Sequence, residues 1–233
     1  LQDLGTADGN SSFATAVSRD GAAVAGNTTN GLGQPRAFRW TTLGGLQDLG
    51  TLGGASSNVG SNKSALSLDG SVVVGASEIN FATPTVFHAF RWTAGGGMQD
   101  LGTLGGANSS ATVASSDGSV VGGSSERADM IGQHAFRWSS TTGMQALGSL
   151  GGLSSFVQAM NPTGTVLVGA ADLSTGQRAY RWSAQTGMLS VEDWLSKSGV
   201  VVSVNGPTTT GANGVSDDGT VVVGALSNNH PFV

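Results

Sequence analysis

A tripeptide made of an aromatic residue, arginine and tryptophan occurs four times in this chain, and its tryptophans are 52, 46 and 44 residues apart. The copies occupy residues 38–40, 90–92, 136–138 and 180–182, and a fifth begins at Pro231-Phe232-Val233. A unit of this length cannot bury its own apolar face, so it stacks on copies of itself. The sequence therefore predicts a single repeat domain over residues 1–233, with repeats at about 1–45, 46–97, 98–143, 144–187 and 188–233.

Each repeat carries two further signals, and both are typical of short strands. A segment such as Met98-Gln99-Asp100-Leu101 follows each tripeptide after a tight loop. An Asp-Gly pair precedes an apolar run such as Val72-Val73-Val74-Gly75, which is a strong hairpin signal before β-branched residues. The Asp-Gly copies lie at 20–21, 69–70, 117–118 and 218–219, with Thr163-Gly164 in one repeat. Tight turns of this kind account for the 38 glycines.

Five repeats of four short strands leave no room for crossover helices, so we expect an all-β, five-bladed β-propeller of four-stranded antiparallel blades. The chain starts with the strand-like segment 1–4 and ends with the strand-like segment 230–233. Pairing of these N- and C-terminal strands would close the ring. A linear β-solenoid is the alternative, and it would leave both end strands unpaired. Ser190 and Asp193 form a capping-box pattern that predicts a short helix at 191–198.

Composition limits the possible partners. Ten basic and fifteen acidic residues give a net charge of -5, and the scattered basic residues argue against a nucleic-acid partner. No apolar run is long enough to span a bilayer, and the N-terminus lacks a signal-peptide layout. Cysteine is absent, which rules out disulfides and cysteine-based sites. We expect no cofactor and no metal, and the low charged fraction of 11% is typical of extracellular proteins.

The segments Gly-Met-Gln-Asp-Leu-Gly-Thr-Leu-Gly-Gly at 97–106, Asp-Gly-Ser-Val-Val-Val-Gly at 69–75 and His-Ala-Phe-Arg-Trp at 88–92 and 134–138 resemble the bacterial extracellular HAF repeat over nearly the whole chain. Arg36 and Arg178 depart from it where histidine is expected, as does Ala7-Asp8-Gly9 in place of Leu-Gly-Gly. The resemblance implies a secreted or cell-surface protein. It often marks an autotransporter passenger, whose outer-membrane barrel would lie C-terminal of this segment. The matching residues define a repeat and no catalytic activity.

Function is therefore expected where the repeat is broken, at the connection between the valine-rich strand and the His-Ala-Phe strand. Apolar and charged residues replace small polar ones there in the second and third repeats, and the predicted partner-binding residues are Glu78, Ile79, Phe81, Phe87, Glu126, Arg127, Met130 and Ile131. We expect an adhesion or recognition module, not an enzyme, that binds a cell-surface protein receptor. One alternative is a multivalent glycan-binding propeller with a shallow polar site per blade. The other is a hydrolase or lyase acting on polysaccharide.

One column of the repeat holds a basic or titratable residue in every copy: Arg36, His88, His134, Arg178 and His230. Side chains facing a central channel would form a ring suited to an anion, whereas the alternative is a repeated local hydrogen bond. Hairpin spacing also places Arg39 opposite Asp48 and Arg91 opposite Asp100, which predicts cross-strand ion pairs. The tripeptide tryptophans are expected to pack between blades.

Overall fold

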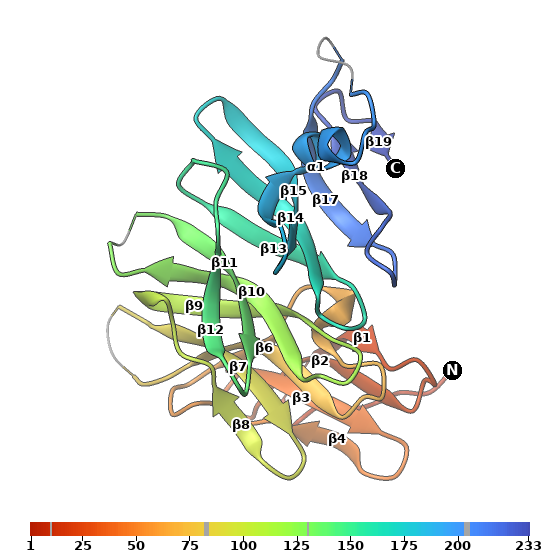
Figure 1. Ribbon diagram of the computed structural model, residues 1–233. Coiled ribbons are helices and arrows are strands. Elements are labelled where there is room, and N and C mark those ends of the chain that lie inside the picture. Colours follow the sequence, from red (N-terminus) through yellow and green to blue (C-terminus); the bar gives the residue numbers. More distant parts are fainter. Residues whose placement is uncertain (10, 82–83, 130, 203–205) are drawn as a thin grey trace.

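The computed structural model describes residues 1–9, 11–81, 84–129, 131–202 and 206–233, which form five antiparallel sheets (Figure 1). Neighbouring strands within every sheet are consecutive in the chain. Sheet A contains β1 (Ser12–Val17), β2 (Ala23–Thr29), β3 (Pro35–Thr41) and β4 (Gly45–Asp48); sheet B contains β5 (Ser57–Val59), β6 (Val72–Glu78), β7 (Phe87–Thr93) and β8 (Gly97–Asp100). Sheet C contains β9 (Gly105–Ala114), β10 (Val120–Arg127), β11 (Gln133–Ser139) and β12 (Gly143–Gly148).

Sheet D contains β13 (Ser155–Met160), β14 (Val166–Leu173), β15 (Gly176–Ser183) and β16 (Gly187–Ser190). Sheet E contains β17 (Thr209–Val215), β18 (Val222–Leu226) and β19 (Pro231–Phe232). A 3-10 turn, η1 (Lys63–Ala65), precedes β6, and the helix α1 (Val191–Lys197) connects sheets D and E. The predicted helix is confirmed, because the Ser190 hydroxyl caps it by accepting from the Asp193 N–H at 3.0 Å.

A glycine follows the apolar run of every second strand because the backbone of the first strand comes very close there. An ideal Cβ on Gly75 would lie 2.0 Å from the backbone oxygen of Asn58 and 2.8 Å from the ring of Phe90. The copies Gly26, Gly123, Gly169 and Gly224 meet a backbone oxygen at 2.0 to 2.2 Å. Only glycine allows the three strands to approach this closely.

The core lies between successive sheets. The second and third strands of each sheet contact the first strand of the next sheet along the chain. Val222 of sheet E joins a buried cluster with Val166 and Val168 of sheet D. The second strands therefore bury apolar side chains on both faces wherever a sheet has two neighbours, and the aromatic residues of the third strands complete the core.

The predicted closure of the ring is not seen. Residues 1–4 belong to no strand, and sheet E ends at β19 with three strands. The start of the chain is held against sheet A instead, since the Ser12 hydroxyl donates to the Gly5 oxygen at 2.7 Å and the Ala7 N–H donates to the Thr28 hydroxyl at 3.1 Å. Within the described residues the five sheets form an open, β-propeller-like arc, with the termini at its two ends (Figure 1).

Candidate functional site

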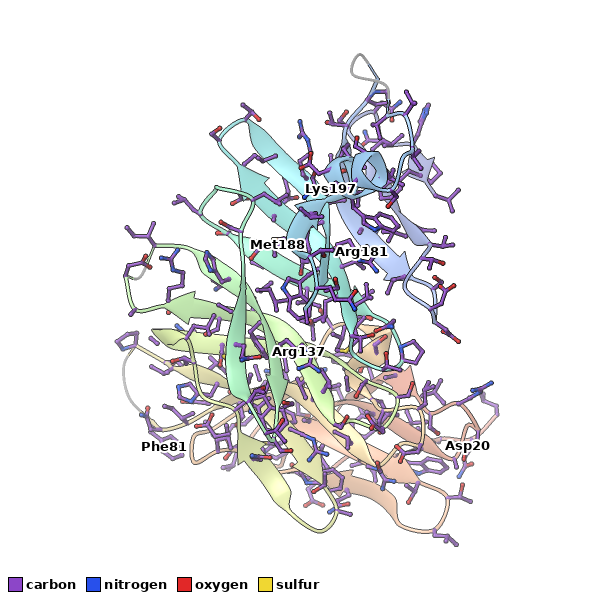
Figure 2. All side chains as sticks on the ribbon, in the orientation of Figure 1. Asp20, Phe81, Arg137, Arg181, Met188 and Lys197 are labelled. Carbon is purple, nitrogen blue, oxygen red and sulfur yellow. The ribbon has the colours of Figure 1, made fainter. Side chains whose placement is uncertain are left out.

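The loops between second and third strands carry exposed apolar side chains in sheets B and C, and we call their described residues, 79–81, 84–86, 128–129 and 131–132, the loop edge. Phe81 is 75% exposed and Ile131 is 54% exposed, and Phe81 lies at the margin of the molecule (Figure 2). Ile79 and Phe87 are half-buried. Met130 lies outside the described residues. The exposed apolar surface of the loop edge thus consists, in the described part of the chain, chiefly of Phe81 and Ile131.

Two acidic residues predicted to bind the partner, Glu78 and Glu126, are engaged inside the sheets. Glu78 is 7% exposed, and its Oε2 accepts from the Ala55 N–H at 3.0 Å. Glu126 Oε2 accepts from the N–H groups of Ala107 at 3.2 Å and Asn108 at 3.1 Å. The Glu78 carboxylate satisfies a backbone donor of the segment before β5, and the Glu126 carboxylate satisfies backbone donors within β9.

Arg127 belongs to a small polar cluster beside the loop edge. Its Nη2 lies 2.5 Å from Asp129 Oδ2, and its Nη1 lies 3.2 Å from His134 Nε2. Burial, and next the charge of Arg127, lower the pKa of His134. The three side chains line a cavity of about 340 Å³ together with Leu104.

The expected central ring of basic residues is not formed. All five lie on or beside the third strand of their sheets, whereas the cavity shared by all five sheets is lined by residues at the ends of first strands and in the neighbouring turns. His88 Nδ1 lies 2.8 Å from Asp100 Oδ2, and Arg36 Nε lies 3.5 Å from Asp48 Oδ2, both on fourth strands. Arg178 donates to the Gln177 oxygen at 2.9 Å, and His230 Nδ1 lies 3.3 Å from Asn228 Nδ2. The column makes local contacts, which was the alternative interpretation.

The predicted ion pairs of the tripeptide arginines are also wrong. Phe38, not Arg39, is opposite Asp48, and this one-residue shift turns the Arg39 side chain to the other face of the sheet. Each arginine Nε instead donates to a glycine oxygen in the Asp-Gly turn of the next sheet, or in the equivalent Thr163-Gly164 turn for Arg137. The pairs are Arg39 with Gly70 at 2.6 Å, Arg91 with Gly118 at 2.8 Å, Arg137 with Gly164 at 2.9 Å and Arg181 with Gly219 at 3.0 Å.

The Asp-Gly turns are hydrogen-bonded internally. Ser115 donates its hydroxyl to Asp117 Oδ1 at 2.7 Å, and the Ser119 N–H donates to the same oxygen at 3.0 Å. These bonds, the Ser119 N–H first, lower the pKa of Asp117 to about 2. The Ser216 hydroxyl and the Thr220 N–H lower the pKa of Asp218 to about 2 in the same way. The aspartates are thus acceptors of the turns and lack the raised pKa of a catalytic acid.

Backbone hydrogen bonds also link these turns around the inner edge. Arg19 N–H donates to Leu68 oxygen at 2.9 Å, Leu68 N–H to Ser116 oxygen at 3.0 Å and Ser116 N–H to Pro162 oxygen at 2.9 Å. The Asn161 side-chain amide continues the series to Asp217 oxygen at 3.2 Å. Residues at the inner ends of all five sheets line one cavity of about 220 Å³.

Two junctions between sheets carry grooves, with charged and hydroxyl side chains, that were not predicted from the sequence. Groove AB, of about 430 Å³, is lined by Ala22, Ala23, Arg39, Thr41, Thr42, Leu43 and Asp69, and its surface is mostly apolar. Groove DE, of about 570 Å³, is lined by Arg181, Ser183, Gln185, Thr186, Trp194 and Asp218. Each combines a tripeptide arginine, the hairpin after the tripeptide and the aspartate of the next turn. The recurrence of a tripeptide arginine 26 to 37 residues before an Asp-Gly pair could have indicated them.

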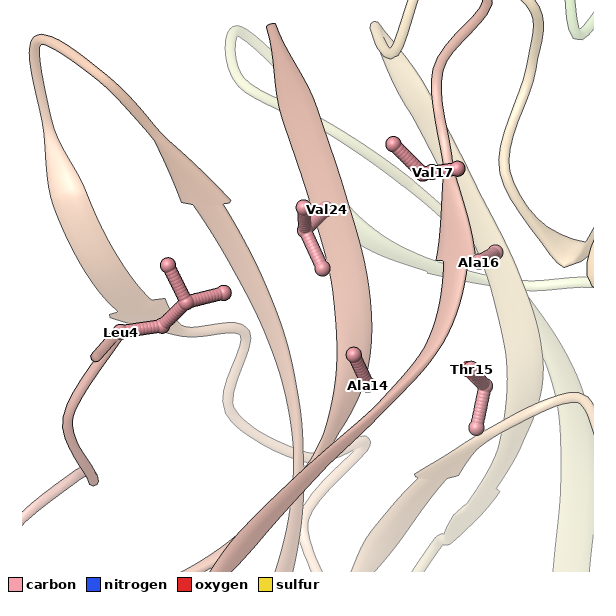
Figure 3. A pocket seen from close by; sticks show the side chains of 6 residues that line it. All are labelled: Leu4, Ala14, Thr15, Ala16, Val17 and Val24. Atoms are coloured by element: carbon pink, nitrogen blue, oxygen red, sulfur yellow. The ribbon is translucent and has the colours of Figure 1, made fainter. Parts of the chain in front are cut away.

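The two ends of the arc each expose an apolar sheet face. On sheet A, a cavity of about 490 Å³ is lined by Leu4, Ala14, Thr15, Ala16, Val17 and Val24 (Figure 3). On sheet E, Val221 is 46% exposed and Val223 is 42% exposed, whereas their copies in sheet D, Val166 and Val168, are at most 5% exposed. These two faces have the positions that other sheets use to contact a neighbour.

The described residues include no cluster of three or more His, Cys, Asp or Glu side chains placed to hold a metal ion. Among the same residues, no helix has the length and apolar character needed to cross a membrane.

No protein-family model and no curated protein matches this sequence. Among solved structures, TolB from Acinetobacter baumannii is similar, with a TM-score of 0.52 and 13% identity over 78% of this chain and 44% of that chain. The putative TolB from Agrobacterium tumefaciens has a TM-score of 0.54 and 16% identity over 75% of this chain and 62% of that chain. The chain thus spans less than two thirds of either structure. At these identities the likeness is one of fold, and it shows that the chain has a β-propeller-like fold.

Proposed function

We propose that the chain is the recognition module of a secreted or surface-displayed bacterial protein, and that it binds a protein receptor on a host or neighbouring cell through the loop edge. The observation that carries the proposal is the exposure of Phe81 and Ile131 in equivalent loops of adjacent sheets. Large apolar side chains displayed on loops above a rigid scaffold are typical of binding surfaces. The HAF-repeat resemblance supports the extracellular setting.

A matched pair of variants tests the role of the loop edge. We expect Phe81→Ala/Ile131→Ala to weaken binding of the purified domain to receptor-bearing cells at least tenfold, because truncating central apolar anchors costs about 2 kcal/mol or more. Leu32→Ala changes an 82% exposed leucine in the equivalent loop of sheet A and is the control. Binding is measured before and after enzymatic glycan removal. Unchanged binding by the double variant would rule out the loop edge.

We further propose that the arc closes into a five-bladed ring, with residues 1–4 added to sheet E as its fourth strand. Asp3 Oδ1 accepts from the Gly5 N–H at 2.9 Å, as Asp48 accepts from Gly50 at 2.8 Å after β4. The Ser12 hydroxyl also donates to Gly5 as Ser57 donates to Gly50. The start of the chain therefore has the local geometry that follows a fourth strand.

Repeat register gives a specific test of this closure. Phe38 pairs with Asp48 and Arg39 with Gln47, so a closed ring pairs Phe232 with Asp3 and Val233 with Gln2. Because the chain has no cysteine, Gln2→Cys/Val233→Cys introduces a single possible disulfide. We expect oxidation to give an intrachain cross-link that migrates as a monomer without reductant. Disulfide-linked dimers, or the absence of an intrachain cross-link after oxidation, would contradict closure.

A further inference from the structure

We propose that grooves AB and DE are two equivalent binding sites for a neutral saccharide. The inference rests on the proposed role as a recognition module, but it concerns the sheet junctions and not the loop edge. Both grooves bring a guanidinium, a carboxylate and hydroxyl-bearing side chains to one concave surface.

The donor in groove DE is the Arg181 guanidinium. Its Nε is engaged with the Gly219 oxygen at 3.0 Å, and its Cζ lies 4.9 Å from the centre of the Trp194 ring. No other hydrogen bond of this guanidinium is found among the described residues. The hydrogen bond of Nε and the contact with the Trp194 ring hold the planar guanidinium in place. Its terminal N–H groups are therefore positioned donors on the groove wall.

The acceptor in groove DE is Asp218. Its Oδ1 already accepts from the Ser216 hydroxyl at 2.6 Å and the Thr220 N–H at 3.0 Å. Among the described residues, its Oδ2 accepts from the Thr220 hydroxyl alone, at 2.8 Å. A carboxylate oxygen has two lone pairs, so Oδ2 retains capacity for a ligand hydroxyl. The turn fixes this carboxylate and keeps it ionised.

Groove AB repeats the same chemistry. Arg39 Nε is engaged with Gly70 oxygen at 2.6 Å, and its Cζ lies 6.0 Å from the centre of the Trp92 ring. Asp69 is fixed by the hydroxyl groups of Ser67 at 2.6 Å and Ser71 at 2.8 Å. Trp92 comes from the next tripeptide, whereas Trp194 comes from α1. Groove AB therefore shares the arginine, the aspartate and the hydroxyl groups of groove DE, whereas an aromatic side chain lines groove DE alone of the two.

The ligand class follows from the mixture of groups. A hydroxyl group both donates and accepts, so adjacent hydroxyls of a sugar can satisfy the guanidinium, the carboxylate and the side-chain hydroxyls together. A polyanion would meet the groove carboxylate and a chain of net charge -5. A neutral saccharide has neither disadvantage.

Calorimetric titration of the complete chain tests the proposal. The probes are the neutral oligosaccharides maltoheptaose, cellohexaose and laminarihexaose, with hexagalacturonate as the acidic comparison. We expect at least one neutral probe to saturate two sites per chain, and hexagalacturonate to bind at least about tenfold more weakly. Absence of binding by all three neutral probes, or preference for the acidic one, would overturn the proposal.

Blocking variants assign the sites. Gln185→Trp and Leu43→Trp each place a bulky ring on the exposed hairpin of one groove, and each is expected to reduce the stoichiometry from two to one. The double variant should not bind. Thr141→Trp is the matched control, because its junction has Thr163 where the other turns have aspartate. Full binding by the double variant would contradict the assignment. Phe81→Ala/Ile131→Ala should retain saccharide binding, so the two proposals fail independently.

Discussion

At the scale of single residues, Tyr180 occupies a position that is phenylalanine in every other sheet. It is fully buried, and its hydroxyl has no hydrogen-bond partner among the described residues. Burial raises the pKa of this phenol. An unsatisfied buried hydroxyl lowers the free energy of unfolding, because it loses its water without gaining a partner.

We therefore expect Tyr180→Phe to raise the free energy of unfolding by about 1 kcal/mol. The same position in other sheets accommodates a phenylalanine, which lacks the hydroxyl, at Phe38, Phe90 and Phe136. Urea unfolding followed by tryptophan fluorescence measures the change. Destabilisation would mean that the hydroxyl has a partner in solution.

Substitution of the glycine in a second strand is expected to change the free energy of unfolding in the opposite direction. Gly75→Ala would place a methyl group against the Asn58 carbonyl and the Phe90 ring. We therefore expect the free energy of unfolding to fall by about 1–3 kcal/mol or more. Gly95→Ala is the matched control, since nothing lies within 4 Å of its added Cβ. The same unfolding experiment compares them, and equal stabilities would contradict the close approach of the strands.

At the scale of elements, the tripeptide arginine links one sheet to the next. Arg91→Lys removes the Nε donor to Gly118, because a lysine ammonium cannot reproduce the fixed guanidinium geometry. We expect the free energy of unfolding to fall by about 1.5–3 kcal/mol, which is the range for hydrogen bonds to charged groups. Arg19→Lys changes an exposed arginine outside the tripeptides and should be nearly neutral. Equal effects of the two changes would argue against the link.

The Asp-Gly turns predict acid sensitivity. The hydrogen bonds of the turn, the Ser119 N–H first, lower the pKa of Asp117 from the ordinary 3.8 to about 2, so the folded state favours the carboxylate. The resulting stabilisation is complete above pH 4 to 5 and is lost as the pH falls towards 2. Unfolding measured from pH 6 to pH 2 should show this decline, and Asp117→Asn should make it less steep. An unchanged slope would contradict the role of the turn.

The sequence predicted the elements well and their contacts poorly. Asp-Gly turns, valine runs and the Ser190 cap are local signals, and the strands and helix they predicted are present. The partners of Arg39, His88 and Glu78 depend on register and on neighbouring sheets, which no local pattern specifies. A shift of one residue between β3 and β4 was enough to change the partner of Asp48. The grooves were missed for the same reason, since each combines two sheets.

At the scale of the whole molecule, the proposed closure predicts that the outer face of sheet E is buried in solution. Val223→Asp should then lower the free energy of unfolding by at least about 2 kcal/mol, the value of a buried valine. Leu32→Asp changes a more exposed apolar residue with no proposed neighbour and should stay within about 0.5 kcal/mol. If the two variants unfold alike, the arc is open.

The last strand also determines how firmly such a ring would hold. At the other four junctions, a third-strand alanine or arginine donates to the following sheet. At the end of the chain these positions are Pro231 and Val233, which have no N–H and no guanidinium to offer. In the proposed closed ring, the seam between sheets E and A would therefore be the weakest of the five junctions. Under a pulling force or in mild denaturant, the contact between sheets E and A would open first, and the other four junctions between sheets would persist.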